Sequence, residues 1–264
     1  MNAKFYHSIN GLSENDINNE LNRLASLEMK AFTPIRTPVC ITLDLSGSMR
    51  HYLAVLKEII RIMDNELRAV QKREFTIFIM GIYNSVPTVL YFGDLRSFDF
   101  ASFVSSLPKS CYGSTPLAAS FTKADEVLER FKKICEENNH WYTIPVFFSV
   151  TDSQSTDSSD DCSKVINKFK FDIADNEKLL VEFVTGSNPS GLNLGGYKIP
   201  IDESGSKDKI IAFMHALRIA TSTEANLEES GTSRMPVKRD RKAYNRYMSD
   251  IMLINFKFCY DRNH

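Results

Sequence analysis

A carboxylate and two hydroxyls stand at alternate positions in the segment Asp44-Leu45-Ser46-Gly47-Ser48. Oxygen ligands without nitrogen or sulfur are typical of a hard divalent cation such as Mg²⁺, which prefers octahedral geometry and keeps several waters. Gly47 would allow a sharp turn, so that both hydroxyls could face one point. On its own the segment decides little, because Ser and Asp before a helix are also ordinary capping residues.

Two later segments carry side chains of the same kinds. Thr115 precedes Pro116, which starts a predicted helix, and Asp152 follows the apolar run 144–150. If the strands before these loops are parallel and adjacent, all three loops meet at one edge of a sheet. Each residue also has a simpler explanation, since the aspartates could form turns and the hydroxyls could cap helices. Five such residues in this order nevertheless favour one metal site. The predicted ligands of Mg²⁺ or Mn²⁺ are Asp44, Ser46, Ser48, Thr115 and Asp152.

The segments D-L-S-G-S, G-S-T-P-L and V-T-D-S resemble, in order and spacing, the three loops of the metal-ion-dependent adhesion site of von Willebrand factor A domains. The resemblance covers residues 37–220 and is similar in character to small cytosolic bacterial members found beside tellurium-resistance and stress operons. It implies that the two Ser hydroxyls and Thr115 contact the metal directly. The two aspartates would act mostly through water, and a Glu or Asp of a partner protein would complete the octahedron.

Five further residues are expected to surround the metal on the partner-binding side: Gly47, Met49, Gly113, Ser114 and Ser153. Ser153 departs from the family's pattern, in which Gly is often found at that position. The departure leaves Asp152 in place but leaves the shape of the third loop open.

Between residues 37 and 220, apolar runs of strand length alternate with amphipathic helical stretches. This alternation is typical of an α/β domain with a doubly wound, mostly parallel central sheet and helices on both faces. The runs 75–83 and 88–92 would form a hairpin that supplies one antiparallel edge strand. Residues 186–206, rich in Gly and Pro, are predicted as a loop with room for a small hairpin. Further strands are predicted at 39–43, 144–150 and 179–184, and helices at 52–67, 98–107, 117–135, 161–169 and 208–220.

Outside this region, the sequence predicts an N-terminal helical extension over residues 1–36, in which Ser13 could cap a helix through residue 29. Residues 221–264 read as a polar, basic linker and a C-terminal segment. The basic cluster 234–246 has few interleaved aromatic residues, so a solvated linker is favoured over a nucleic-acid surface.

Composition excludes several classes of protein. The 264 residues carry a net charge of −1, which gives no global attraction to nucleic acid or membranes. The five cysteines are scattered and contain no C-x-x-C pair, which argues against a disulfide framework and a structural zinc site. The first residues show no basic region followed by an apolar core, and no apolar run is long enough to span a membrane. We therefore expect a cytoplasmic location.

Two local alternatives remain at this stage. The acidic, hydroxyl-rich stretch 151–161 could bind calcium, but the spacing of its acidic residues does not match a calcium-binding loop. A solvated loop whose last aspartates stabilise the N-terminus of the next helix is the preferred interpretation. His51 could face the metal, although a helix-start position is the more usual explanation for such a residue.

The function that follows is a divalent-metal-dependent adaptor, not an enzyme, whose site captures an acidic residue of a partner protein, in a stress or defence system. One alternative is a metal-dependent hydrolase or phosphotransferase that uses the same Asp/Ser loop. A phosphotransferase of the haloacid-dehalogenase kind would need a second Asp where Ser46 stands, and no G-x-S-x-G elbow or P-loop occurs. The other alternative is a scaffold with a vestigial metal site, against which all five ligand-type residues argue.

Overall fold

The computed structural model describes residues 11–26, 36–69, 74–138, 140, 142–175, 177–185, 191–201, 208, 210 and 211. Within these ranges six strands form one sheet in the order β3-β2-β1-β4-β5-β6. All neighbours are parallel except β2 and β3, which form the antiparallel hairpin at one edge. The strands are β1 (Arg36–Asp44), β2 (Glu74–Tyr83), β3 (Val86–Asp94), β4 (Val146–Thr151), β5 (Leu179–Thr185) and β6 (Tyr197–Ile201).

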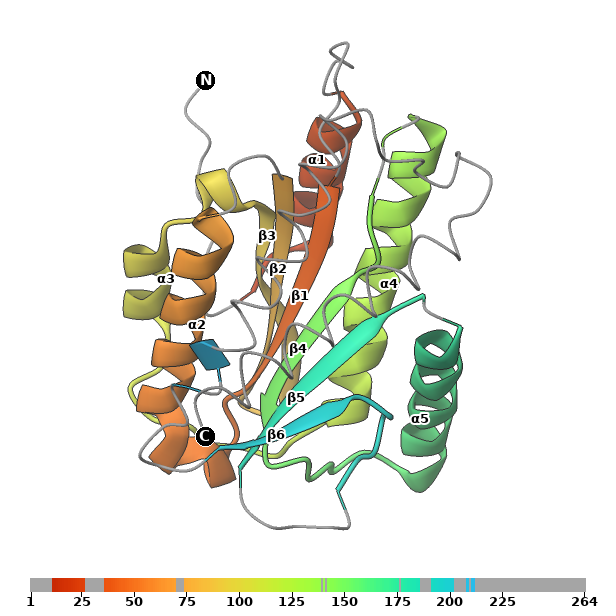
Figure 1. The fold of residues 1–264 in the computed structure, drawn as a ribbon. Helices are drawn as coiled ribbons and strands as arrows, with labels where there is room; N and C mark the ends of the chain where they lie inside the picture. The colour runs from red at the N-terminus through yellow and green to blue at the C-terminus, as the bar shows by residue number, and fades with distance from the viewer. Residues whose placement is uncertain are drawn as a thin grey trace.

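Helices cover both faces of the sheet (Figure 1), so the predicted fold class is confirmed. One apolar cluster joins the sheet to the helices α2 (Leu53–Arg68) and α3 (Phe100–Ser106). The other joins the opposite face to α1 (Glu14–Ala25), α4 (Leu117–Glu137) and α5 (Ser159–Ala174). β1 is buried along its whole length because it lies between two strands and under both helical layers.

The prediction that residues 186–206 form a loop with a small hairpin is wrong for residues 197–201. This segment is β6, and it pairs parallel to β5 from Tyr197 to Ile201. The strand is short and lies at the edge of the described sheet, and only Ile199 and Ile201 are buried. An edge position tolerates Pro200, so the Gly and Pro residues that indicated a loop did not exclude a strand.

The described part of the N-terminal extension packs against the sheet. Ser13 caps α1 in a reciprocal pair with Asp16, as predicted, but the helix ends at Ala25 and not at residue 29. Ile17, Leu21 and Leu24 are buried in the same cluster as α4. The domain boundaries at residues 36 and 220 stay predictions. The expected tail 221–264 and its basic cluster lie outside the described residues, as does most of the predicted helix 208–220.

A row of polar side chains crosses the centre of the sheet on the face covered by α4 and α5. Thr42 of β1 is in register with Ser149 of β4, which is in register with Glu182 of β5. Each is at most 2% exposed, and one oxygen of each has no hydrogen-bond partner among the described residues. Burial raises the pKa of Glu182 to about 7, while the neighbouring Lys198 of β6 acts in the opposite direction.

Candidate metal site

Three loops meet at one edge of the sheet because β1 and β4 are adjacent and parallel, with Leu43 opposite Val150. Asp44 ends β1, and Thr151, at the end of β4, donates a hydrogen bond of 2.8 Å from its hydroxyl to Asp44 Oδ2. The loop before α4 is tied to the third loop, since the N–H of Thr156 donates to the carbonyl of Thr115 at 2.8 Å. The topology therefore brings the three predicted segments together.

Backbone hydrogen bonds also join the first two loops. The N–H of Gly47 donates to the carbonyl of Gly113 at 3.2 Å, and the N–H of Tyr112 donates to the carbonyl of Leu45 at 3.2 Å. Gly47 does not have a positive φ, so the sharp turn expected at this residue does not use the left-handed conformation that glycine allows. The chain turns instead into a short 3₁₀ helix, η1 (Gly47–Tyr52), which leads into α2.

The hydroxyls of Ser46 and Ser48 face each other, with 3.3 Å between the two Oγ atoms. Two ligands at about 2.1 Å from an octahedral ion, at right angles to each other, would be about 3 Å apart. The Ser46 N–H donates to Asp44 Oδ1 at 3.0 Å, which closes the loop between them. The spacing of these two hydroxyls thus fits neighbouring ligands of a hard divalent cation.

The capping explanation fails for two of the predicted ligands. Ser46 occupies the N-cap of η1, but its side chain makes no capping hydrogen bond. Thr115 does not cap α4 either, because Asp157 accepts from the Ala118 N–H at 2.8 Å and thereby occupies this helix terminus. The turn explanation does hold for the aspartates: Asp44 accepts from the Ser46 N–H, and Asp152 accepts from the Gln154 N–H at 3.0 Å.

The two predicted carboxylate ligands are buried, with Asp44 0% and Asp152 8% exposed. Burial is the main cause that raises the pKa of Asp44, and the charge of Asp152 raises it further, while hydrogen bonds from Ser46 and Thr151 act in the opposite direction. Nowhere in the described ranges do three or more His, Cys, Asp or Glu side chains group in a way that could hold a metal. Binding at this edge would therefore depend on hydroxyl and water ligands beside the two carboxylates.

Ser153 adopts the left-handed conformation, with φ of 62°. The third loop thus makes the turn for which Gly is the usual residue, at a cost of about 1 kcal/mol for a residue with a Cβ. Two backbone contacts hold it: its N–H donates to the Thr151 hydroxyl at 3.0 Å, and its carbonyl accepts from the Leu192 N–H at 2.7 Å. Gly191 packs so closely that a Cβ there would lie 2.5 Å from the Cβ of Ser153.

The residues expected on the partner-binding side divide into two groups. Gly113 and Ser114 are exposed and Gly47 is half-buried, whereas Met49 and Ser153 are almost fully buried. The buried pair can only support the loops from beneath; the Met49 sulfur, for example, accepts a hydrogen bond of 3.5 Å from Thr185 of β5.

The β2–β3 turn belongs to this edge of the sheet, although sequence reasoning gave it no role. Asn84 and Ser85 have φ of 51° and 64°, and the Ser85 hydroxyl accepts from the Ser114 N–H at 2.8 Å. Gly113, with φ of 91°, lies so close that a Cβ would be 2.8 Å from the Ser85 nitrogen. Two turn-forming residues between two predicted strands indicate a tight hairpin, so the turn was recognisable, but its contact with the second loop was not.

The other local alternatives are resolved by their surroundings. In the stretch 151–161, Asp157 caps α4 and Ser158 caps α5, and Asp160 and Asp161 lie in the first turn of α5. The acidic and hydroxyl side chains of this loop thus stabilise the N-termini of two helices. His51 lies exposed in η1, where its Nε2 accepts from the Arg50 guanidinium at 2.9 Å.

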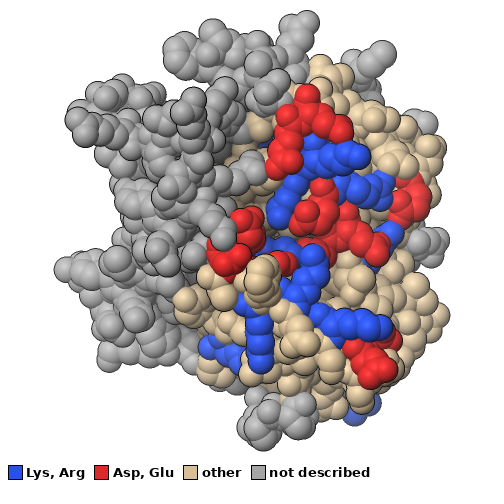
Figure 2. All heavy atoms as spheres, turned by 90° about the vertical axis from the view of Figure 1, so that its right-hand side faces the viewer, with Lys and Arg blue, Asp and Glu red and all other residues tan. Residues whose placement is uncertain are grey.

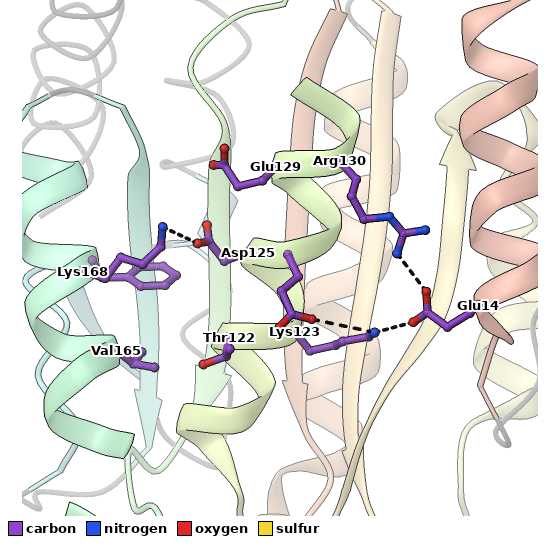
Figure 3. Close-up of a pocket in the computed structure, with 10 residues that line it drawn as sticks. Glu14, Thr122, Lys123, Asp125, Glu129, Arg130, Val165 and Lys168 are labelled. Carbon is purple, nitrogen blue, oxygen red and sulfur yellow. Dashed lines mark hydrogen bonds and ion pairs between the residues drawn. The ribbon is translucent and has the colours of Figure 1, made fainter. Parts of the chain in front are cut away.

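A depression lies between α1, α4 and α5, with a volume of about 600 Å³ (Figure 3). Acidic and basic side chains mix on this face (Figure 2). In the close-up, Arg130 Nη1 lies 2.9 Å from Glu14 of α1, Lys123 also contacts Glu14, and Lys168 Nζ lies 2.9 Å from Asp125. These pairs hold α1 and α5 against α4, so the depression is best explained by helix packing.

Comparison with protein-family models gives no match, and neither does comparison with curated proteins. Solved structures with a similar fold include a von Willebrand factor type A protein from Catenulispora acidiphila, at 14% identity and a TM-score of 0.49 over 71% of this chain and 43% of that one. The manganese-loaded TRAP protein of Plasmodium vivax has 18% identity to this chain and a TM-score of 0.46, over 66% of this chain and 71% of that one. The pilus adhesin SpaC of Lactobacillus rhamnosus GG has 10% identity to this chain and a TM-score of 0.51, over 75% of this chain and 31% of that one.

These likenesses concern the fold alone. This chain spans less than half of the Catenulispora chain and about a third of SpaC. In the described part of this chain, no helix has the length and apolar character needed to cross a membrane.

Proposed function

We propose that this protein is a von Willebrand factor A-type adaptor that binds Mg²⁺ or Mn²⁺ through Asp44, Ser46, Ser48, Thr115 and Asp152. The observation that carries the proposal is the facing pair of hydroxyls, Ser46 and Ser48, next to the buried carboxylate of Asp44. Neither Ser46 nor Thr115 is engaged in helix capping. Their side chains therefore have no capping role that would explain them without a metal.

A cation held mainly by neutral hydroxyls keeps much of its charge, so it binds an incoming carboxylate strongly. The partner would supply a Glu or Asp at the exposed side of the three loops. Exposed charges in the first two loops are basic, at Arg50 and Lys109, which also favours an acidic partner. We propose a binding role and not catalysis, in a stress or defence system as the resemblance implies.

We also propose that the protein acts in the cytoplasm. Within the described residues Cys40, Cys111 and Cys162 are free thiols, and the first two are buried. Free thiols persist in a reducing compartment, whereas secreted domains of this size often use disulfides.

Titration calorimetry with MnCl₂ tests the metal assignment. Ser48 is exposed, so Ser48→Ala removes one proposed ligand without disturbing the core, and Asp44→Ala removes the central carboxylate. We expect each change to weaken Mn²⁺ binding by about tenfold or more, since each removes an oxygen that is proposed to hold the ion. The control Asp160→Ala removes an exposed carboxylate at the start of α5 and should bind as the wild type. Equal Mn²⁺ binding by wild type and Ser48→Ala would refute the assignment.

A further inference from the structure

An apolar surface lies beside the candidate metal site. It consists of Tyr83, Val86 and Tyr112, and we call it the tyrosine rim. Val86 is 53% and Tyr112 43% exposed, so two of the four exposed large apolar side chains in the described ranges lie here. Tyr83 is half-buried and is paired across the hairpin with Val86, which places these two side chains on the same face of the strands.

The rim is fixed to the first metal loop through one residue. The N–H of Leu45 donates to the carbonyl of Ile82 at 3.0 Å, next to Tyr83, and the carbonyl of Leu45 accepts from the N–H of Tyr112 at 3.2 Å. Leu45 itself lies between the proposed ligands Asp44 and Ser46. Both tyrosines are therefore anchored on the backbone that holds the proposed cation.

Side-chain contacts hold the rim together. The rings of Tyr83 and Tyr112 meet edge to face, with 4.8 Å between centroids and an interplanar angle of 63°, and their hydroxyls are in contact. The turn Asn84-Ser85 is held to the second loop by the hydrogen bond between Ser85 and Ser114. Ordered aromatic side chains lose little entropy when a partner covers them, so they are effective contacts in binding surfaces.

We infer that the tyrosine rim selects the partner: it binds an apolar side chain that stands next to the carboxylate taken by the metal. This inference rests on the proposed function. Because consecutive residues of an extended segment are about 3.8 Å apart, a side chain one or two positions from the carboxylate would reach a surface anchored on Leu45. The exposed charges of the first two loops, Arg50 and Lys109, do not favour a basic neighbour. The partner segment is therefore an Asp or Glu adjacent to an aromatic or large aliphatic residue.

The test uses three blocked synthetic peptides, Ac-Gly-Asp-Gly-NH₂, Ac-Gly-Asp-Phe-NH₂ and Ac-Phe-Asp-Gly-NH₂, titrated into the full chain in the presence of MgCl₂ and followed by NMR. We expect one of the Phe peptides to bind about fivefold or more tightly than the Gly peptide, because its ring covers the tyrosine rim. Tyr112→Ala should reduce the difference to less than about twofold while leaving Mn²⁺ binding unchanged. Phe171→Ala, which removes an exposed ring from α5, should keep the preference.

Val86→Ser provides a second variant if Tyr112→Ala does not fold, and it should also reduce the preference for Phe. Metal-dependent binding of all three peptides with equal affinity would overturn the rim's role and leave the proposed function standing. A wild-type protein that binds no Mn²⁺ would overturn both.

Discussion

Glu182 is a carboxyl group in the middle of the sheet, and replacing it with glutamine should change how stability depends on pH. The side chain is 2% exposed, and its Oε2 has no hydrogen-bond partner in the described part of the chain. Its pKa is about 7 in the folded protein and 4.5 in an unperturbed glutamate, with burial as the main cause of the difference. A glutamine side chain at this position would have nearly the same shape but would never ionise.

The direction of the effect follows from proton binding. Between pH 4.5 and 7 the folded state holds a proton at Glu182 that the unfolded state has released, so the free energy of unfolding falls as pH rises through this window. A pKa difference of about 2.5 corresponds to about 3 kcal/mol, at 1.36 kcal/mol for each unit. Below pH 4.5 wild type and Glu182→Gln should be similar in stability, and at pH 8 the variant should be more stable by about 3 kcal/mol.

Urea unfolding at pH 4.5, 6 and 8, in the presence of a chelator, measures this difference. The chelator keeps metal binding from contributing, and subtracting the two proteins removes the titration of all other groups. Glu137→Gln is the matched control, because Glu137 is a 60% exposed side chain at the end of α4, 3.8 Å from Lys133. A difference between wild type and Glu182→Gln that does not grow between pH 4.5 and pH 8 would refute the reasoning.

Two further substitutions test other parts of the structure. Ser153→Gly should raise the free energy of unfolding by about 1 kcal/mol, because glycine adopts the left-handed conformation without strain and because the change removes a buried hydroxyl that has no partner among the described residues. A urea unfolding curve with a lower midpoint than that of the wild type would contradict this. Lys178→Met should lower the free energy of unfolding by about 3 kcal/mol, because the side chain of Lys178 is 2% exposed and pairs with the carboxylates of Asp125 and Asp172. A variant that unfolds at the urea midpoint of the wild type would show that these ion pairs contribute nothing to stability.

Most of the fold could be predicted from the sequence because its central strands are continuous apolar runs. The run 39–43 lies within β1, and the run 179–184 lies within β5. β6 was not predicted because only two of its five residues are buried, and because it contains Pro200 and follows Gly195 and Gly196. A short edge strand obtains its order from its neighbour, which a local pattern does not contain.

Part of the candidate site could be predicted from the sequence in the same way, and part could not. The positions of Asp44 and Asp152 at one edge of the sheet follow from the parallel arrangement of the strands that precede them. The hydrogen bond from Tyr112 to Leu45 and the capping of α4 by Asp157 join segments that are far apart in the sequence. Such contacts could not be predicted, and the capping of α4 by Asp157 is the observation that argues against a capping role for Thr115.

The hydrogen bond between Thr151 and Asp44 joins residues that are 107 positions apart. Contacts between residues so far apart in the sequence form slowly, so we expect these three loops to come together after β4 has docked beside β1. A ligand that binds all three loops would then act late on the folding pathway. It would lengthen the lifetime of the folded state by slowing unfolding, and it would leave the rate of folding nearly unchanged.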